Sequence, residues 1–113
     1  MKAAFETGII IIDRDALDVL KHEDIFPALC RHANCDWGDG SPRGKLRNNA
    51  TLKHDIKRPI VSIYHDSNGT KFFIHTEWDR IETFVILAED YLCGSTSIVD
   101  QIKLKLLQGK KMK

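Results

Sequence analysis

The segment PIVSIYHDSNGTKFFIHTEWDRIETFVIL, from Pro59 to Leu87, carries the strongest indication of fold in this sequence. It contains three runs rich in β-branched and aromatic residues, each bounded by residues typical of turns. The letters DSNG, at residues 66–69, separate the first two runs, and Asn and Gly tolerate the positive φ angles of a tight hairpin. Sequential strands with short links pair antiparallel, which predicts a three-stranded meander over about residues 60–65, 71–76 and 83–88.

An isoleucine-rich run lies well upstream of the meander. It predicts a short buried strand over about residues 5–12 as a candidate fourth strand, although periodicity alone also leaves a helical turn open. Between this run and the meander we expect two or three helices. After the meander we expect a C-terminal helix capped by Ser97. Helices on both sides of a meander predict an α+β fold.

The expected helices differ in how they would pack. The first begins at the N-cap Asp13 and runs to about Lys21. The second begins near Glu23 and places one apolar face against the core, made of Ile25, Phe26, Leu29 and Cys30. The third begins at Ser41-Pro42, runs through about His54, and packs through Leu46, Ala50 and Leu52.

Length and composition predict one soluble domain. The chain has 113 residues, 42% hydrophobic and 29% charged, which is enough for a single core. It contains no apolar run of about 20 residues, so we expect no membrane helix. Three cysteines without a dense pattern are typical of reduced thiols, and a cytoplasmic location follows from that expectation. A basic tail is predicted at about residues 108–113.

The segment CRHANCDWGDGSP, residues 30–42, concentrates chemically active side chains. Cys30, His32 and Cys35 are of ligand type for zinc, yet no second ligand pair follows at the usual spacing. We therefore predict no metal and no cofactor.

A small enzyme is the least favoured functional class. Its candidate catalytic residues are His32 with Asp36, Asp39 or Glu77, and they would have to converge in one cleft. No phosphate-loop, zinc-protease or hydrolase signature occurs in the sequence. Aspartates and glutamates are common in turns, so a structural role is the alternative for these carboxylates.

Four residues are predicted to bind a partner: Trp37, Glu77, Asp79 and Arg80. Trp37 is either a lid over the core, which we favour, or an exposed anchor, since tryptophan is enriched at binding hot spots. Arg80 is predicted to tie the second hairpin to the Asp36–Asp39 loop through a bidentate pair with one of those carboxylates.

Nucleic-acid binding is the alternative function. Its warrant is a set of cations in or near the third helix and in the tail: Lys45, Arg47, Lys53, Lys57, Arg58, Lys110 and Lys111. A formal net charge of +1 argues against a strongly basic binder, because such binding depends on a large field of one sign.

Two motifs carry a resemblance to a known family. The first is DWGDGSP after the pair Arg31-His32, and the second is GTKFFIHTEWDR followed by Thr83, where the family pattern has threonines. Together they resemble a family of small bacterial proteins of unknown function, often encoded on plasmids or mobile elements. The match covers about Leu29 to Tyr91. The chain departs from the family pattern at Arg43-Gly44 and at Ala88.

Members of this family sometimes carry the label of a type I restriction enzyme modification subunit. Such subunits are much longer and contain an N-P-P-[FY] motif that this chain lacks, so a methyltransferase is not expected. The resemblance implies an accessory protein of mobile-element biology. Taken with the residues, it predicts a non-enzymatic protein-interaction or regulatory module whose partner is another protein. A homodimer through pairing of the N-terminal strand is a further hypothesis.

Overall fold

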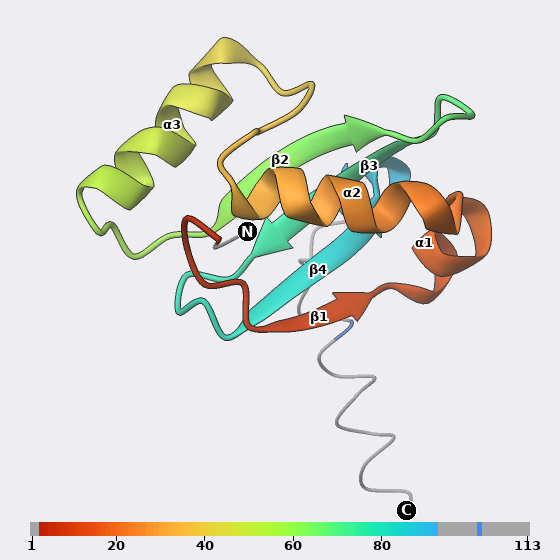
Figure 1. The fold of residues 1–113 in the computed structure, drawn as a ribbon, viewed down its shortest axis with the longest axis horizontal. Coiled ribbons are helices and arrows are strands. Elements are labelled where there is room, and N and C mark those ends of the chain that lie inside the picture. The colour runs from red at the N-terminus through yellow and green to blue at the C-terminus, as the bar shows by residue number, and fades with distance from the viewer. Residues whose placement is uncertain (1–2, 93–101, 103–113) are drawn as a thin grey trace, which may run out of the picture.

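The computed structural model describes residues 3–92 and residue 102. These residues form one four-stranded sheet with four helices (Figure 1). In chain order the elements are β1 (Ile9–Ile12), α1 (Arg14–Val19), α2 (His22–Ala33), α3 (Pro42–Lys53), β2 (Ile60–His65), β3 (Lys71–Thr76), β4 (Glu82–Leu87) and α4 (Ala88–Leu92).

The predicted meander is confirmed. β2 pairs with β3 and β3 with β4, both antiparallel, and the first two strands span the predicted residues. The last strand is Glu82–Leu87, because Ala88 already begins α4. Gly69 in the first hairpin has a φ of 84°, the positive angle that the turn requires. The predicted α+β class is correct.

The N-terminal strand joins the sheet next to β4, and the strand order is β1-β4-β3-β2. It pairs parallel to β4, with Ile9 opposite Glu82 and Ile12 opposite Val85. The expectation of a buried strand is wrong, because β1 lies at the edge and leaves Ile9 65% exposed.

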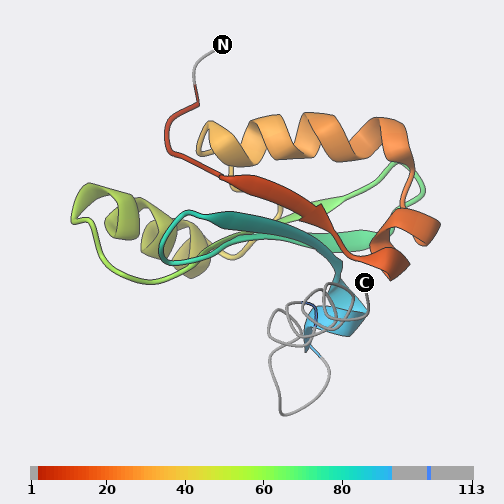
Figure 2. The same cartoon turned by 90° about the horizontal axis from the view of Figure 1, so that it is seen from below.

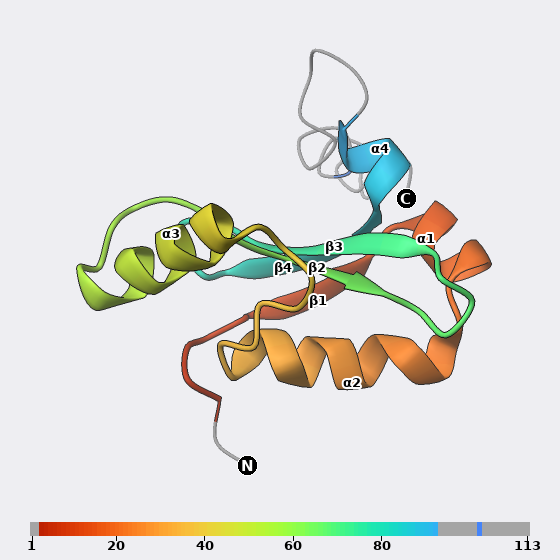
Figure 3. The same ribbon diagram turned by 90° about the horizontal axis from the view of Figure 1, so that it is seen from above.

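Helices lie on both faces of the sheet. α2 covers one face, α4 lies on the other, and α1 lies at the end of the sheet (Figures 2 and 3). The main core lies under α2, where Ile25 and Ala28 pack with Tyr64, Phe72 and Ile74. Beneath α4, Phe84 and Ile86 form a smaller cluster with Ile102.

Two of the packing predictions are wrong. For α2, the predicted apolar face includes Phe26 and Cys30. The buried face is instead formed by Ile25, Ala28 and His32, which leaves Phe26 72% exposed and Cys30 at the surface. In α3 Leu46 is 69% exposed.

The physical reason for the α3 error is a polar contact. α3 turns Asn48 and Thr51 inward, since the Asn48 amide hydrogen-bonds the backbone of Val61 in β2. A contact with the edge of a strand therefore decides which face of α3 is buried.

The expected C-terminal helix capped by Ser97 and the basic tail lie outside the described residues. Within the described part of the chain, no helix has both the length and the apolar character of a membrane span.

Candidate functional site

His32 lies in the last turn of α2 and is completely buried. Its Nδ1 atom hydrogen-bonds the hydroxyl of Ser62, and its Nε2 atom lies 2.8 Å from Oγ1 of Thr76. Oγ1 of Thr76 is 2.7 Å from Oγ1 of Thr83, which donates to the carbonyl of Thr7 at 2.6 Å. The chain of bonds joins α2, three strands of the meander and the N-terminal segment.

This chain of hydrogen bonds fixes the tautomer of His32. The Thr83 hydroxyl donates its only proton to the Thr7 carbonyl, so it must accept the hydrogen bond from Thr76. Thr76 must then accept from Nε2–H of His32, and Nδ1 accepts from Ser62. Burial lowers the pKa of His32 to about 3, and the positive charges of His75 and Arg80 act in the same direction. His32 is a neutral structural residue.

The proposed catalytic set does not converge. Asp36 is held at the surface by Arg31, with 2.8 Å from Nε to Oδ2 and 3.2 Å from Nη2 to Oδ1. Asp39 pairs with His65 at 2.8 Å, also at the surface. Neither carboxylate is a hydrogen-bond partner of His32, and Glu77 pairs instead with His75. Both ring nitrogens of His32 bond hydroxyl groups, so the prediction of a His32 acid–base site is wrong.

Arg80 does not reach the Asp36–Asp39 loop, so the predicted tie is wrong. Its Nη1 atom donates to two backbone carbonyls, that of Glu77 at 2.7 Å and that of Arg58 at 3.1 Å. Arg80 itself has a φ of 63° in the turn between β3 and β4. A bidentate pair with Asp36 does exist, but it comes from Arg31, five residues earlier.

The two tryptophans differ in their exposure to solvent. Trp37 is 5% exposed, and its Nε1 donates to Oδ1 of Asn49 at 2.8 Å. Its ring meets the ring of His32 edge to face at 5.9 Å. The lid interpretation of Trp37 is confirmed, and the exposed-anchor alternative is contradicted. Trp78, in the turn between β3 and β4, is 50% exposed.

Trp78 belongs to a group of exposed apolar side chains at one end of the sheet. Ile81 is 57% exposed, and its carbonyl accepts from the backbone N–H of Ile9 at 2.9 Å. The ammonium group of Lys57 lies 6.0 Å from the Trp78 ring, which brings the neighbouring segment to the same end. We call Ile9, Ile56, Trp78 and Ile81 the apolar end patch.

Glu77 and Asp79 occupy different environments. Oδ1 of Asp79 accepts from the backbone of Ile81 and shapes the exposed turn. Oε1 of Glu77 lies 2.8 Å from Nε2 of His75, whose Nδ1 lies 2.8 Å from the Tyr91 hydroxyl. His75 and Tyr91 line a hollow of about 300 Å³ together with Arg47 of α3. Sequence reasoning missed this triad, although His75 and Glu77 stand two residues apart, as neighbours on one face of a strand do.

The predicted nucleic-acid-binding cations lie in different parts of the structure. Lys45, Arg47 and Lys53 lie on α3, a helix without an acidic residue that packs beside β2 (Figure 1). Arg58 instead serves the fold, since its Nε donates to Oγ1 of Thr51 at 2.6 Å. Lys57 lies near Trp78. Lys110 and Lys111 lie outside the described residues.

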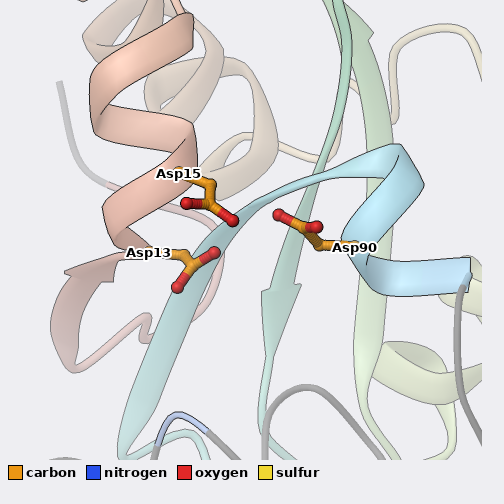
Figure 4. Close-up of side chains that lie close together, drawn as sticks. All are labelled: Asp13, Asp15 and Asp90. Atoms are coloured by element: carbon orange, nitrogen blue, oxygen red, sulfur yellow. The ribbon is translucent and has the colours of Figure 1, made fainter.

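Three aspartates meet where α1 and α4 approach each other. The carboxylate oxygens of Asp13, Asp15 and Asp90 lie within 4.8 Å of one another (Figure 4). Burial raises the pKa of Asp90, and its hydrogen bond with Asp15 raises it further. Oxygen ligands suit hard divalent cations such as Ca²⁺, so these residues are of the type that could hold one. Among the described residues, Cys30, His32 and Cys35 do not gather in this way.

Comparisons with protein family models, curated proteins and solved structures return no match. The resemblance of the two sequence motifs to small bacterial proteins of mobile elements therefore stays a prediction.

Proposed function

We propose that this chain is a small non-enzymatic protein-interaction or regulatory module that binds another protein through its apolar end patch. The observation that supports this most is Trp78, a large aromatic side chain that is half exposed in the same turn as the exposed Ile81. Tryptophan surrounded by apolar residues is typical of binding hot spots. Contiguous apolar surface on a small protein commonly marks an interaction site.

Two sequence observations support the biological setting of this proposal. The resemblance to small plasmid-encoded bacterial proteins suits a role in mobile-element or host-defence biology. Three cysteines without a dense pattern suit the cytoplasm, where thiols stay reduced.

The proposal predicts that Trp78→Ser abolishes partner binding without unfolding the chain. Trp78 is half exposed and lies in a turn, so its loss should cost about 1 kcal/mol of stability or less. The measurement is chemical cross-linking of the tagged chain in its native host, followed by identification of the captured proteins. A captured protein should appear with the wild-type chain and disappear with the variant.

Phe26→Ser is the matched control, because Phe26 is a large exposed aromatic residue on α2, outside the apolar end patch. It should leave capture unchanged. Equal capture by the wild type and the Trp78→Ser variant would contradict the proposal.

Nucleic-acid binding is the second candidate, and one observation favours it. Arg43, Lys45, Arg47 and Lys53 on α3 give four positive charges, and no acidic residue lies between Ser41 and His54. Phosphate contacts of this kind weaken steeply with salt.

The alternative predicts micromolar binding to generic DNA or RNA at low salt, measured by fluorescence anisotropy. The Arg43→Glu/Arg47→Glu variant should abolish it. Absence of binding by the wild-type chain at low salt would remove this candidate.

A further inference from the structure

In the described part of the chain, the two edge strands of the sheet differ in whether their outer backbone groups are hydrogen-bonded. The β2 edge is closed: the Asn48 amide bonds both the N–H and the carbonyl of Val61, and the Gly38 loop bridges to Ile63. Ile63 accepts from the backbone of Asp39 at 2.7 Å and donates to Trp37 at 3.3 Å. Covering an edge in this way prevents further strand pairing.

The β1 edge is open in the described part of the chain. Ile9 and Asp13 donate their backbone N–H groups to β4, to the carbonyls of Ile81 and Val85. Alternate residues of a strand direct their backbone groups to opposite sides, so Ile10 and Ile12 direct theirs outward. No described helix or strand lies along this side of β1 (Figure 2). Ile9 and Ile10 are both exposed there.

We infer that a second copy of this chain pairs with β1 in antiparallel order, joining two sheets into one of eight strands. The inference rests on the proposed protein-interaction function and names its partner. A two-fold axis requires antiparallel pairing, because each copy must present the same surface to the other. The outward N–H and carbonyl of Ile10 are then complementary to those of Ile10 in the second copy.

Two registers would pair the outward backbone groups of β1, one with Ile10 at the two-fold axis and one with Ile11 there. The position of a charged residue distinguishes them. With Ile10 opposite Ile10, Ile9 lies opposite Ile11, so the residues of β1 meet only apolar partners. With Ile11 at the axis, Ile9 would instead lie opposite Asp13, which places a carboxylate against an exposed isoleucine. The register centred on Ile10 is therefore favoured.

The antiparallel order also matches apolar surfaces beyond β1. β1 runs from the turn between β3 and β4 toward α1 (Figure 1). Pairing therefore brings the end of one copy that carries Ile81 toward α1 of the other. There Leu17 and Val19 are exposed. Both ends of the paired strands gain apolar contacts, since the symmetry repeats the match.

The test is disulfide cross-linking of the full chain with Cys30, Cys35 and Cys93 replaced by serine, so that the introduced cysteine is the only thiol. Ile10→Cys should form a dimer on mild oxidation, since paired residues across the axis lie about 5.5 Å apart between Cα atoms. Ile12→Cys is the matched control. Its counterpart in the second copy is offset by about 13 Å along the strand, which is too far for a disulfide.

A charge placed at the axis tests the dimer without a cysteine. Ile10→Lys should weaken dimerisation about tenfold or more, because symmetry places the two lysines directly opposite each other. Ile10 is 41% exposed in the single chain, so the fold should tolerate the change. Light scattering over a concentration series gives the dissociation constant, and the thermal midpoint of the variant checks the fold.

A monomeric wild-type chain at 100 µM (about 1 mg/mL), taken as the upper limit for a useful dimer, would overturn the inference. So would a dimer in which Ile11→Cys cross-links and Ile10→Cys does not. Capture of a different protein that is lost with Trp78→Ser, by a chain that stays monomeric, would overturn the second copy as partner. The proposed interaction function would then still stand.

Discussion

Lowering the pH from about 6.5 to about 3 should weaken the fold by an amount on the order of 5 kcal/mol through His32. The unfolded chain binds a proton at this histidine below about pH 6.5, whereas burial keeps the folded-state pKa at about 3. The stabilisation is therefore complete above pH 6.5. It is lost on acidification at about 1.4 kcal/mol per pH unit. Urea unfolding at a series of pH values measures this slope.

His32→Gln separates this effect from other titrating groups. The glutamine amide can still donate toward Thr76, but it does not reproduce the ring, so the variant should be less stable than the wild type at neutral pH. Because glutamine does not titrate, the variant should lose less unfolding free energy on acidification. Equal slopes for the wild type and His32→Gln between pH 6 and pH 4 would contradict the role of His32.

Trp37→Ala should lower the free energy of unfolding by about 3–5 kcal/mol, a typical loss for a buried aromatic residue. The indole is buried beside His32 and Phe5, so its removal leaves a cavity next to the buried hydrogen-bond chain. Trp37→Phe should cost less, about 1–2 kcal/mol, because it keeps most of the ring but loses the hydrogen bond to Asn49. Chemical denaturation of both variants gives these values.

Trp78→Ala is the internal comparison for this prediction. The same change at a half-exposed tryptophan should cost about 1 kcal/mol or less. If the Trp37 and Trp78 variants were equally stable, the lid role of Trp37 would be wrong.

Local features of the fold could be predicted from the sequence. The meander follows from three β-rich runs, and its first hairpin follows from Asn68-Gly69, where Gly69 has a φ of 84°. Ser41 caps α3 as expected, accepting from the backbone N–H of Gly44 at 3.1 Å. These features depend on residues within a few positions of one another, whose conformational preferences can be read along the chain.

Side-chain partners from distant segments could not be predicted. The sequence predicts Arg80 near Asp36, but its side chain donates to the backbone carbonyls of Glu77 and Arg58. The exposed tryptophan proved to be Trp78, because Trp37 is covered where α2 meets the sheet. As a residue type, tryptophan is usually mostly buried, so the sequence predicts the same burial for both. Their different exposure is set by how the surrounding segments pack.

The three antiparallel strands, the α+β class and the cap of α3 follow from the sequence alone, since each depends on local backbone preference. The parallel pairing of β1 with β4, and the bonds of His32 to Ser62 and Thr76, 30 and 44 residues away, become visible only in the folded chain. Such contacts form when distant segments share one core. No repeat or local propensity encodes which distant residues will meet there.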